Sequence, residues 1–206
     1  MSKITSTQLH LGEAASAGSS TAAEGQIWVK SDAPSSLYHT DDTGVDHRIN
    51  GTTFGTNTTT TGGTTIVFGS IPTGVTEIIV MIAGISWSGT GDTYFQLGDA
   101  GGIETSGYVG MLSTDSGVTQ GWSSGATLQA QGVAASVHSG MIICKLMNAA
   151  TFHWAIQHQM ANTQGTFNWF ATGYKALSAE LTQLRLISSG GSETVDALVG
   201  MNIQYN

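Results

Sequence analysis

The feature of this sequence that most limits its fold is an alternation of apolar and polar residues with a period of two. In residues 152–160 one set of alternate positions is apolar and includes Trp154 and Ile156, whereas the other is polar and includes Gln157. The same period returns in residues 201–205. Because successive side chains of a β-strand point to opposite faces, this pattern predicts strands with one buried face. No stretch carries a convincing helical stripe.

Turn-forming composition and strand spacing extend this prediction to a whole domain. The chain has 28 glycines and two prolines, which together with many Thr and Ser residues favours short strands joined by tight turns. Residues 75–86 read as a long buried strand, and residues 137–148 and 151–160 read as a hairpin. Residues 175–188 are ambiguous and are interpreted as a turn leading into a strand. About eight strands at spacings of about 8 to 14 residues predict an all-β fold with a jelly-roll-like β-sandwich.

The chain divides by composition into four segments. The first is small, polar and weakly patterned, and the third is a low-complexity run of Thr and Gly. We therefore predict an extended N-terminal arm (1–21), a β-meander (22–51), a Thr/Gly linker (52–65) and the sandwich (66–206).

The predicted meander has too little apolar material for a core of its own. Burial contributes about 25 cal/mol per Å² of apolar surface, which for so few side chains does not offset the ordering entropy of the segment. The meander therefore needs a partner surface, supplied by other chains. Its large apolar residues are Ile27, Trp28, Val29, Leu37 and Tyr38.

Charge excludes several classes of function. Charged residues make up 10% of the chain, with only six Lys and Arg and a net charge of −8. Nucleic-acid binding needs clustered cations, and the sequence has no basic cluster. No apolar run approaches the ~18 residues of a membrane span, and the N-terminus lacks the apolar region of a secretory signal. The one cysteine, Cys144, cannot form an intrachain disulfide.

No motif for catalysis stands out. Glycoside cleavage would need paired carboxylates, but Asp92, Asp99, Glu104 and Asp115 lie in glycine-rich loops without a recognisable motif. The segment GISWSG follows a strand, yet no helix pattern follows it, as a nucleophile elbow requires. We expect a protein that is not an enzyme.

The sequence gives equally little support for a metal-binding or cofactor-binding site. His153 and His158 are five residues apart and fall on opposite faces of a strand, and His138 lies on another strand. The segment DDTGVD lacks the closing Glu of a calcium loop and is interpreted as a hairpin turn. Cys144 is interpreted as a small buried apolar residue. We expect neither a metal nor a cofactor.

Aromatic residues in or beside the Gly/Ser loops leave two interpretations open. Their rings could stack on sugars at a glycan-binding rim, or they could fill the core or a subunit interface. These residues are Trp87, Tyr94, Tyr108, Trp122 and Trp169.

One stretch resembles a known kind of module. The pattern GQIWVK followed by PSSLYHTDDTG, in residues 25–44, is similar to a short module of tail fibres and other virion proteins of tailed bacteriophages. The segments IPTGVTEIIVMIAGIS, QLGDAGGIETSGYVG and LTQLRLIS, with the C-terminal DALVGMNIQYN, resemble the β-sandwich domain that often accompanies it. The resemblance covers most of the chain. It implies a non-enzymatic homotrimer made in the bacterial cytoplasm and built into a virion.

The function implied is a short trimeric tail fibre with a head that binds host-surface glycan. Its partners would be further copies of itself, other virion proteins that contact the N-terminal region, and host polysaccharide. The five apolar residues of the meander would form the anchor. The alternative is a trimeric capsid decoration or cement protein. A polysaccharide depolymerase is the enzymatic alternative, but the chain lacks the long repeating body of such spikes.

Overall fold

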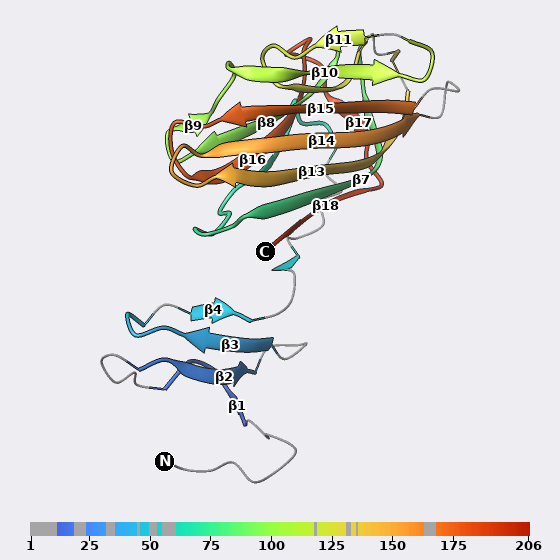
Figure 1. Ribbon diagram of the computed structural model, residues 1–206. Coiled ribbons are helices and arrows are strands. Elements are labelled where there is room, and N and C mark those ends of the chain that lie inside the picture. Colours follow the sequence, from blue (N-terminus) through green and yellow to red (C-terminus); the bar gives the residue numbers. More distant parts are fainter. Residues whose placement is uncertain are drawn as a thin grey trace. The chain divides into compact units, whose positions relative to one another are not determined.

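A computed structural model divides the protein into two compact units, residues 1–52 (unit 1) and residues 53–206 (unit 2). Every regular element in the part of the chain that the structure describes is a β-strand, which confirms the predicted all-β class (Figure 1). The described residues are 12–18, 24–31, 36–44, 46–49, 53–54, 61–117, 119–130, 133–134, 136–162 and 168–206.

Unit 1 is a four-stranded sheet whose strands lie in chain order. The first pairs in parallel with the second, and the second, third and fourth form an antiparallel meander. Gly44 has a φ of 85° in the turn before the fourth strand, and its N–H donates to the Asp41 carbonyl at 3.1 Å. Residues 1–11 and 19–21 of the predicted arm, and residues 22–23 and 32–35 of the predicted meander, lie outside the described residues. The strands are β1 (Glu13–Ala14), β2 (Gln26–Lys30), β3 (Ser36–Thr40) and β4 (Asp46–Arg48).

The larger sheet of unit 2 has nine strands in the order β11-β10-β15-β14-β13-β7-β18-β5, with β17 also paired to β7. Its centre is the antiparallel run β13, β14 and β15, which are consecutive along the chain. The strands are β5 (Thr53–Phe54), β7 (Glu77–Trp87), β10 (Tyr108–Thr114), β11 (Thr119–Gly121), β13 (His138–Asn148), β14 (His153–Asn162), β15 (Asn168–Ala176), β17 (Val195–Ala197) and β18 (Gly200–Tyr205).

The smaller sheet has five strands in the order β12-β8-β16-β6, with β9 paired to β8. Figure 1 shows it behind the larger sheet, so that unit 2 is a two-layered sandwich in which the chain crosses repeatedly between layers. The strands are β6 (Thr65–Phe68), β8 (Thr93–Asp99), β9 (Gly102–Ile103), β12 (Ala126–Gln129) and β16 (Leu181–Ser188).

Alternating residues of both sheets fill one hydrophobic core. On β14 the alternate residues Trp154, Ile156 and Met160 are buried, whereas Gln157 is exposed, as the period of two predicts. Cys144 on β13 is completely buried, which confirms its interpretation as an apolar residue, and burial raises the pKa of its thiol.

Two segments differ from the sequence interpretation. β15 lies in the middle of the larger sheet, where the sequence indicated no strand. Residues 53–54 of the predicted linker form β5, which pairs with β18, and residues 55–60 lie outside the described residues. Of the turn and strand expected in residues 175–188, the strand is confirmed as β16, but Lys175 and Ala176 still belong to β15 and the turn is limited to residues 177–180.

Candidate functional site

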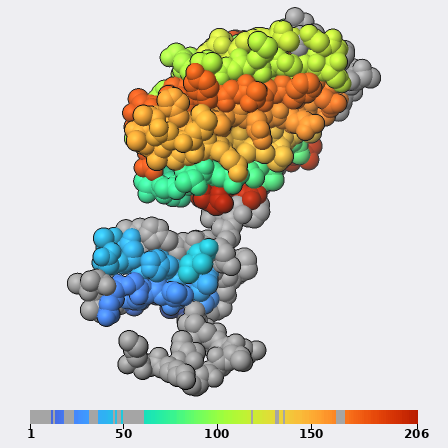
Figure 2. Space-filling model, viewed as in Figure 1, coloured from blue at the N-terminus to red at the C-terminus, as the bar shows by residue number. Residues whose placement is uncertain are grey.

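The outer surface of the larger sheet is the most unusual surface of unit 2. In Figures 1 and 2 the strands from β10 to β18 follow one another across this face, and no other described segment of unit 2 crosses it. We call this surface the open face. Its residues are Glu77, Ile79 and Met81 of β7, Val109, Met111 and Ser113 of β10, Met141, Ile143 and Lys145 of β13, Ala155, Gln157 and Gln159 of β14, Phe170, Thr172 and Tyr174 of β15, and Asn202 and Gln204 of β18.

Apolar side chains on the open face are exposed to an extent that is unusual for a sheet surface. Met111 is 54% exposed and Met141 is 43% exposed, and the Phe170 and Tyr174 rings are exposed to a similar extent. Large apolar patches on a protein surface commonly mark sites of interaction.

Strand register places these residues in rows that run across the sheet. Met141 lies opposite Met81 on one side and Gln159 on the other, and Gln159 in turn lies opposite Phe170. Gln159 on β14 is therefore flanked by apolar side chains on both neighbouring strands, and Gln157 lies between Ile143 on β13 and Thr172 on β15. Such a surface offers both apolar contact and neutral hydrogen-bonding groups.

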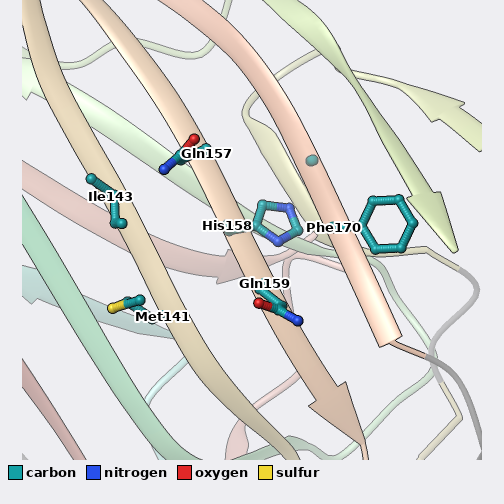
Figure 3. A pocket seen from close by; sticks show the side chains of 7 residues that line it. Met141, Ile143, Gln157, His158, Gln159 and Phe170 are labelled. Carbon is teal, nitrogen blue, oxygen red and sulfur yellow. The ribbon is translucent and has the colours of Figure 1, made fainter. Parts of the chain in front are cut away.

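A hollow of about 410 Å³ lies over β13, β14 and β15. Figure 3 shows Gln157 and Gln159 on β14, between Met141 and Ile143 on β13 and Phe170 on β15. A second hollow of about 120 Å³ adjoins it and shares Ile143 and Gln157. The small side chains of β14 and β15, such as Ala155 and Thr172, leave this space between the larger ones.

The open face carries almost no charge. Its two charged residues are Lys145 and Glu77, which pair with an Nζ–Oε1 distance of 3.1 Å at the end of the strands. The formal charge of the face is therefore zero, although the chain as a whole has a net charge of −8.

Two of the acids considered as catalysts are held in a network at one end of the sandwich. Asp99 accepts a hydrogen bond from Ser178 Oγ at 2.5 Å. Glu104 forms an ion pair with the buried Lys175 and accepts a hydrogen bond from the backbone N–H of Ser178 at 2.6 Å. The Ser178 bond holds the pKa of Asp99 below its ordinary value. Burial alone would raise the pKa of Glu104, but its hydrogen bonds to Lys175 and Ser178 outweigh that effect and lower it. These carboxylates fasten loops to β15.

The other two acids are engaged in similar ways. Asp92 accepts from Gln120 Nε2 at 2.9 Å, and Asp115 accepts from the backbone N–H of Asn168. Each of these two carboxylates is therefore held by a residue from another segment of the sandwich.

Four of the five loop aromatics belong to the core. Trp87, Tyr108, Trp122 and Trp169 are all buried, so their rings present no face to a sugar. Trp87 Nε1 donates to Thr93 Oγ1 at 3.0 Å, and the Tyr108 hydroxyl accepts from Leu97 N at 2.7 Å. Tyr94 is partly exposed, on the smaller sheet. Of the five rings considered as glycan contacts only Tyr94 is thus partly exposed, because Trp87, Tyr108 and Trp169 occupy inward-facing positions of β7, β10 and β15.

The apolar residues of the meander divide between its two faces. The Trp28 and Tyr38 rings stack on one face with centroids 5.2 Å apart, and Trp28 Nε1 donates to Thr40 Oγ1 at 2.9 Å. Trp28 is 8% exposed, whereas Ile27 on the other face is 57% exposed.

The cross-strand pair Val29 and Leu37 shares the face of Ile27 and is only partly buried. Three of the five predicted anchoring residues therefore form an apolar surface, and the other two hold the sheet together.

The three histidines considered as metal ligands do not share one side of the sheet. His138 and His158 point into the core, whereas His153 lies on the other side of β14. Burial lowers the pKa of His138 and of His158 to about 4. Among the described residues no group of three or more His, Cys, Asp or Glu side chains is arranged to hold a metal ion.

The chain matches no protein-family model, no curated protein and no solved structure. Within the described part of the chain, no helix has the length and apolar character needed to cross a membrane.

The open face was missed by sequence reasoning, although part of its signal was visible. The alternation in residues 152–160 identified Gln157 and Gln159 as outward-facing. The exposed side of the neighbouring strands could not be identified in the same way, because Met141 and Ile143 are as apolar as the buried residues beside them.

Proposed function

We propose that this protein is a non-enzymatic structural protein of a bacteriophage virion. In this proposal it is a homotrimer whose N-terminal meander attaches to the particle and whose sandwich is the head of a short tail fibre that contacts the host surface. The similarity of residues 25–44 to a module of virion proteins supports the assignment. So does the engagement of Asp99 and Glu104 in a network that fastens loops.

The observation that carries this proposal is the apolar face of unit 1. Ile27, Val29 and Leu37 lie together on the side of the meander opposite the Trp28–Tyr38 stack. A sheet with one large buried side chain gains its remaining apolar burial from another molecule. An attachment site on a particle would supply that surface.

The burial of the loop aromatics favours a second candidate, a capsid decoration or cement protein. A receptor-binding head needs exposed groups for a glycan, and Tyr94 alone of the five predicted rings is partly exposed. A decoration protein needs an anchor and a stable outward domain, and it does not need a ligand.

Labelling the protein on intact virions distinguishes these two candidates. Immunogold labelling at the tail would support the fibre, and labelling across the head lattice would support the decoration protein. Absence of the protein from purified virions would overturn the proposal as a whole.

The anchor is tested by the substitution Ile27→Asp. A carboxylate on the apolar face would have to lose its hydration when the face docks, so we expect incorporation into virions to fall at least tenfold. Because Ile27 is exposed, the variant should remain folded. Quantitative blotting of purified virions, with Ser16→Asp as the control that adds the same charge at an exposed position outside the strands, measures the effect. Equal incorporation of both variants would show that this face is not the anchor.

A further inference from the structure

The open face has the composition of an interface between proteins. Its exposed apolar residues include Met111, Met141, Phe170 and Tyr174, which are of the types enriched at protein interfaces, and charged residues are nearly absent from it. Scattered apolar residues on a surface are common, but here exposed apolar side chains lie together on β10, β13 and β15 of one sheet face.

Charge indicates which partner fits this face. Copies of a chain with a net charge of −8 repel one another over most of their surface. On the open face the Lys145–Glu77 pair leaves no net charge, so two copies can approach there without that repulsion. A nucleic acid or an anionic glycan would find no unpaired cation on it.

The polar groups of the face are also suited to meeting a copy of themselves. Gln157, Gln159, Asn202 and Gln204 carry amides, each of which can both donate and accept hydrogen bonds. Amides of one copy can therefore pair with amides of another without leaving a buried charge.

The size of the face agrees with this partner. Six strands about 4.8 Å apart, followed over about eight residues at about 3.4 Å each, give a surface of roughly 800 Å². A specific protein interface of standard size buries about 800 Å² on each partner. A bound sugar covers a smaller area and depends more on aromatic rings than on methionines.

We propose that the open face is the surface through which copies of this chain associate. The inference rests on the homotrimer in the proposed function and adds the surface that forms it, with each face packed against the other two copies. The hollow over β13, β14 and β15 is then filled by side chains of a neighbouring copy rather than by a small ligand.

Light scattering and native mass spectrometry of the full chain test this inference. We expect the native protein at about three times its 21.3 kDa monomer mass, and Met141→Glu at the monomer mass because the new carboxylates repel across the interface. The matched control is Val67→Glu on β6, a position of the smaller sheet that is 51% exposed, which should remain trimeric. Thermal unfolding of both variants checks that they are folded.

A measurement on the native protein avoids the need for a variant. Mild peroxide treatment followed by peptide mass spectrometry should oxidise Met147, which lies beyond Lys145 on β13 and is 56% exposed, at least fivefold faster than Met111 and Met141. Equal rates at the three methionines would overturn the inference.

The outcomes separate this inference from the proposed function. A trimer that persists in Met141→Glu would place the interface elsewhere and leave the homotrimer intact. A native monomer would overturn both the open-face interface and the homotrimer, while attachment through Ile27 would still be decided by virion incorporation. Binding of the native monomer to dextran or mannan, lost in Met141→Glu, would identify the face as a sugar site and overturn the inference.

Discussion

At the residue scale, two glycines explain how a large ring fits inside the sandwich. Gly110 on β10 and Gly173 on β15 are cross-strand partners, and both point toward the core. The Trp122 indole fills the space that their missing side chains leave. A Cβ added at Gly110 would lie 2.5 Å from Trp122 Cε3 and 2.8 Å from the Thr172 carbonyl oxygen. These glycines are needed for packing rather than for a turn.

The substitution Gly110→Ala should therefore destabilise the protein. Overpacking against a buried ring and a backbone oxygen should lower the free energy of unfolding by about 1 to 3 kcal/mol. Urea unfolding followed by tryptophan fluorescence measures it. Gly121→Ala on β11, where an added Cβ meets nothing within 4 Å, should change stability by less than about 0.5 kcal/mol. If both variants had the same stability as the native chain, the close packing of Trp122 on Gly110 would be contradicted.

Two buried histidines predict that the protein loses stability in mild acid. The folded-state pKa of His138 and of His158 is about 4, below the unfolded value of about 6.5. Below pH 6.5 the unfolded chain therefore binds protons that the folded chain does not. The free energy of unfolding falls as a result, by up to about 3 kcal/mol for each histidine, as the pH drops from about 6.5 to about 4. Asp99 and Glu104, whose pKa values are also lowered, add a loss of the same sign at lower pH.

Urea titrations between pH 7.5 and pH 4.5 measure this dependence. His158→Gln should flatten the fall in free energy of unfolding, and Gln157→Asn, an exposed substitution on β14 that removes no titratable group, should leave it unchanged. Equal slopes for all three proteins would show that these histidines do not control acid stability.

At the scale of elements, most of the fold could be predicted, and β15 shows why part could not. The strands with alternating large apolar residues, such as β14 and β18, were evident from the sequence. On β15 the inward positions after Trp169 are Ala171, Gly173 and Lys175, which are small or charged. The ring of Trp122 and the partner of Lys175, Glu104, come from other segments and compensate for them. Side chains from distant segments complete the inward face of this strand, so a local pattern could not reveal it.

The same reasoning applies to the candidate site. The sequence located the apolar residues of the meander, but it could not assign Trp28 and Tyr38 to one face and Val29 and Leu37 to the other with different roles. It also placed Trp87 and Trp169 beside loops, without showing that they occupy inward-facing positions of β7 and β15. These outcomes depend on contacts between segments that are far apart along the chain.

At the scale of the whole molecule, the two units differ greatly in how much core each contains. The hydrophobic core cluster of the described residues runs from Ile66 to Ile203 and includes no residue of unit 1. We therefore expect residues 53–206, expressed alone, to unfold cooperatively. Their free energy of unfolding should lie within about 1 kcal/mol of the value for the same unit in the full chain. Urea unfolding of the two chains at the same concentration measures it. A shortened chain without a cooperative transition would show that the sandwich depends on unit 1.

The lengths of the outermost strands bear on how the assembly stops growing. In the described part of unit 2 the larger sheet ends at β11 and β5, of three and two residues, and the smaller sheet ends at β12 and β6, of four residues each. Long unpaired edges invite further strands to add indefinitely, as in fibrils, and short ones give little template for this. A chain made in many copies at once can therefore form finite oligomers and avoid runaway polymerisation.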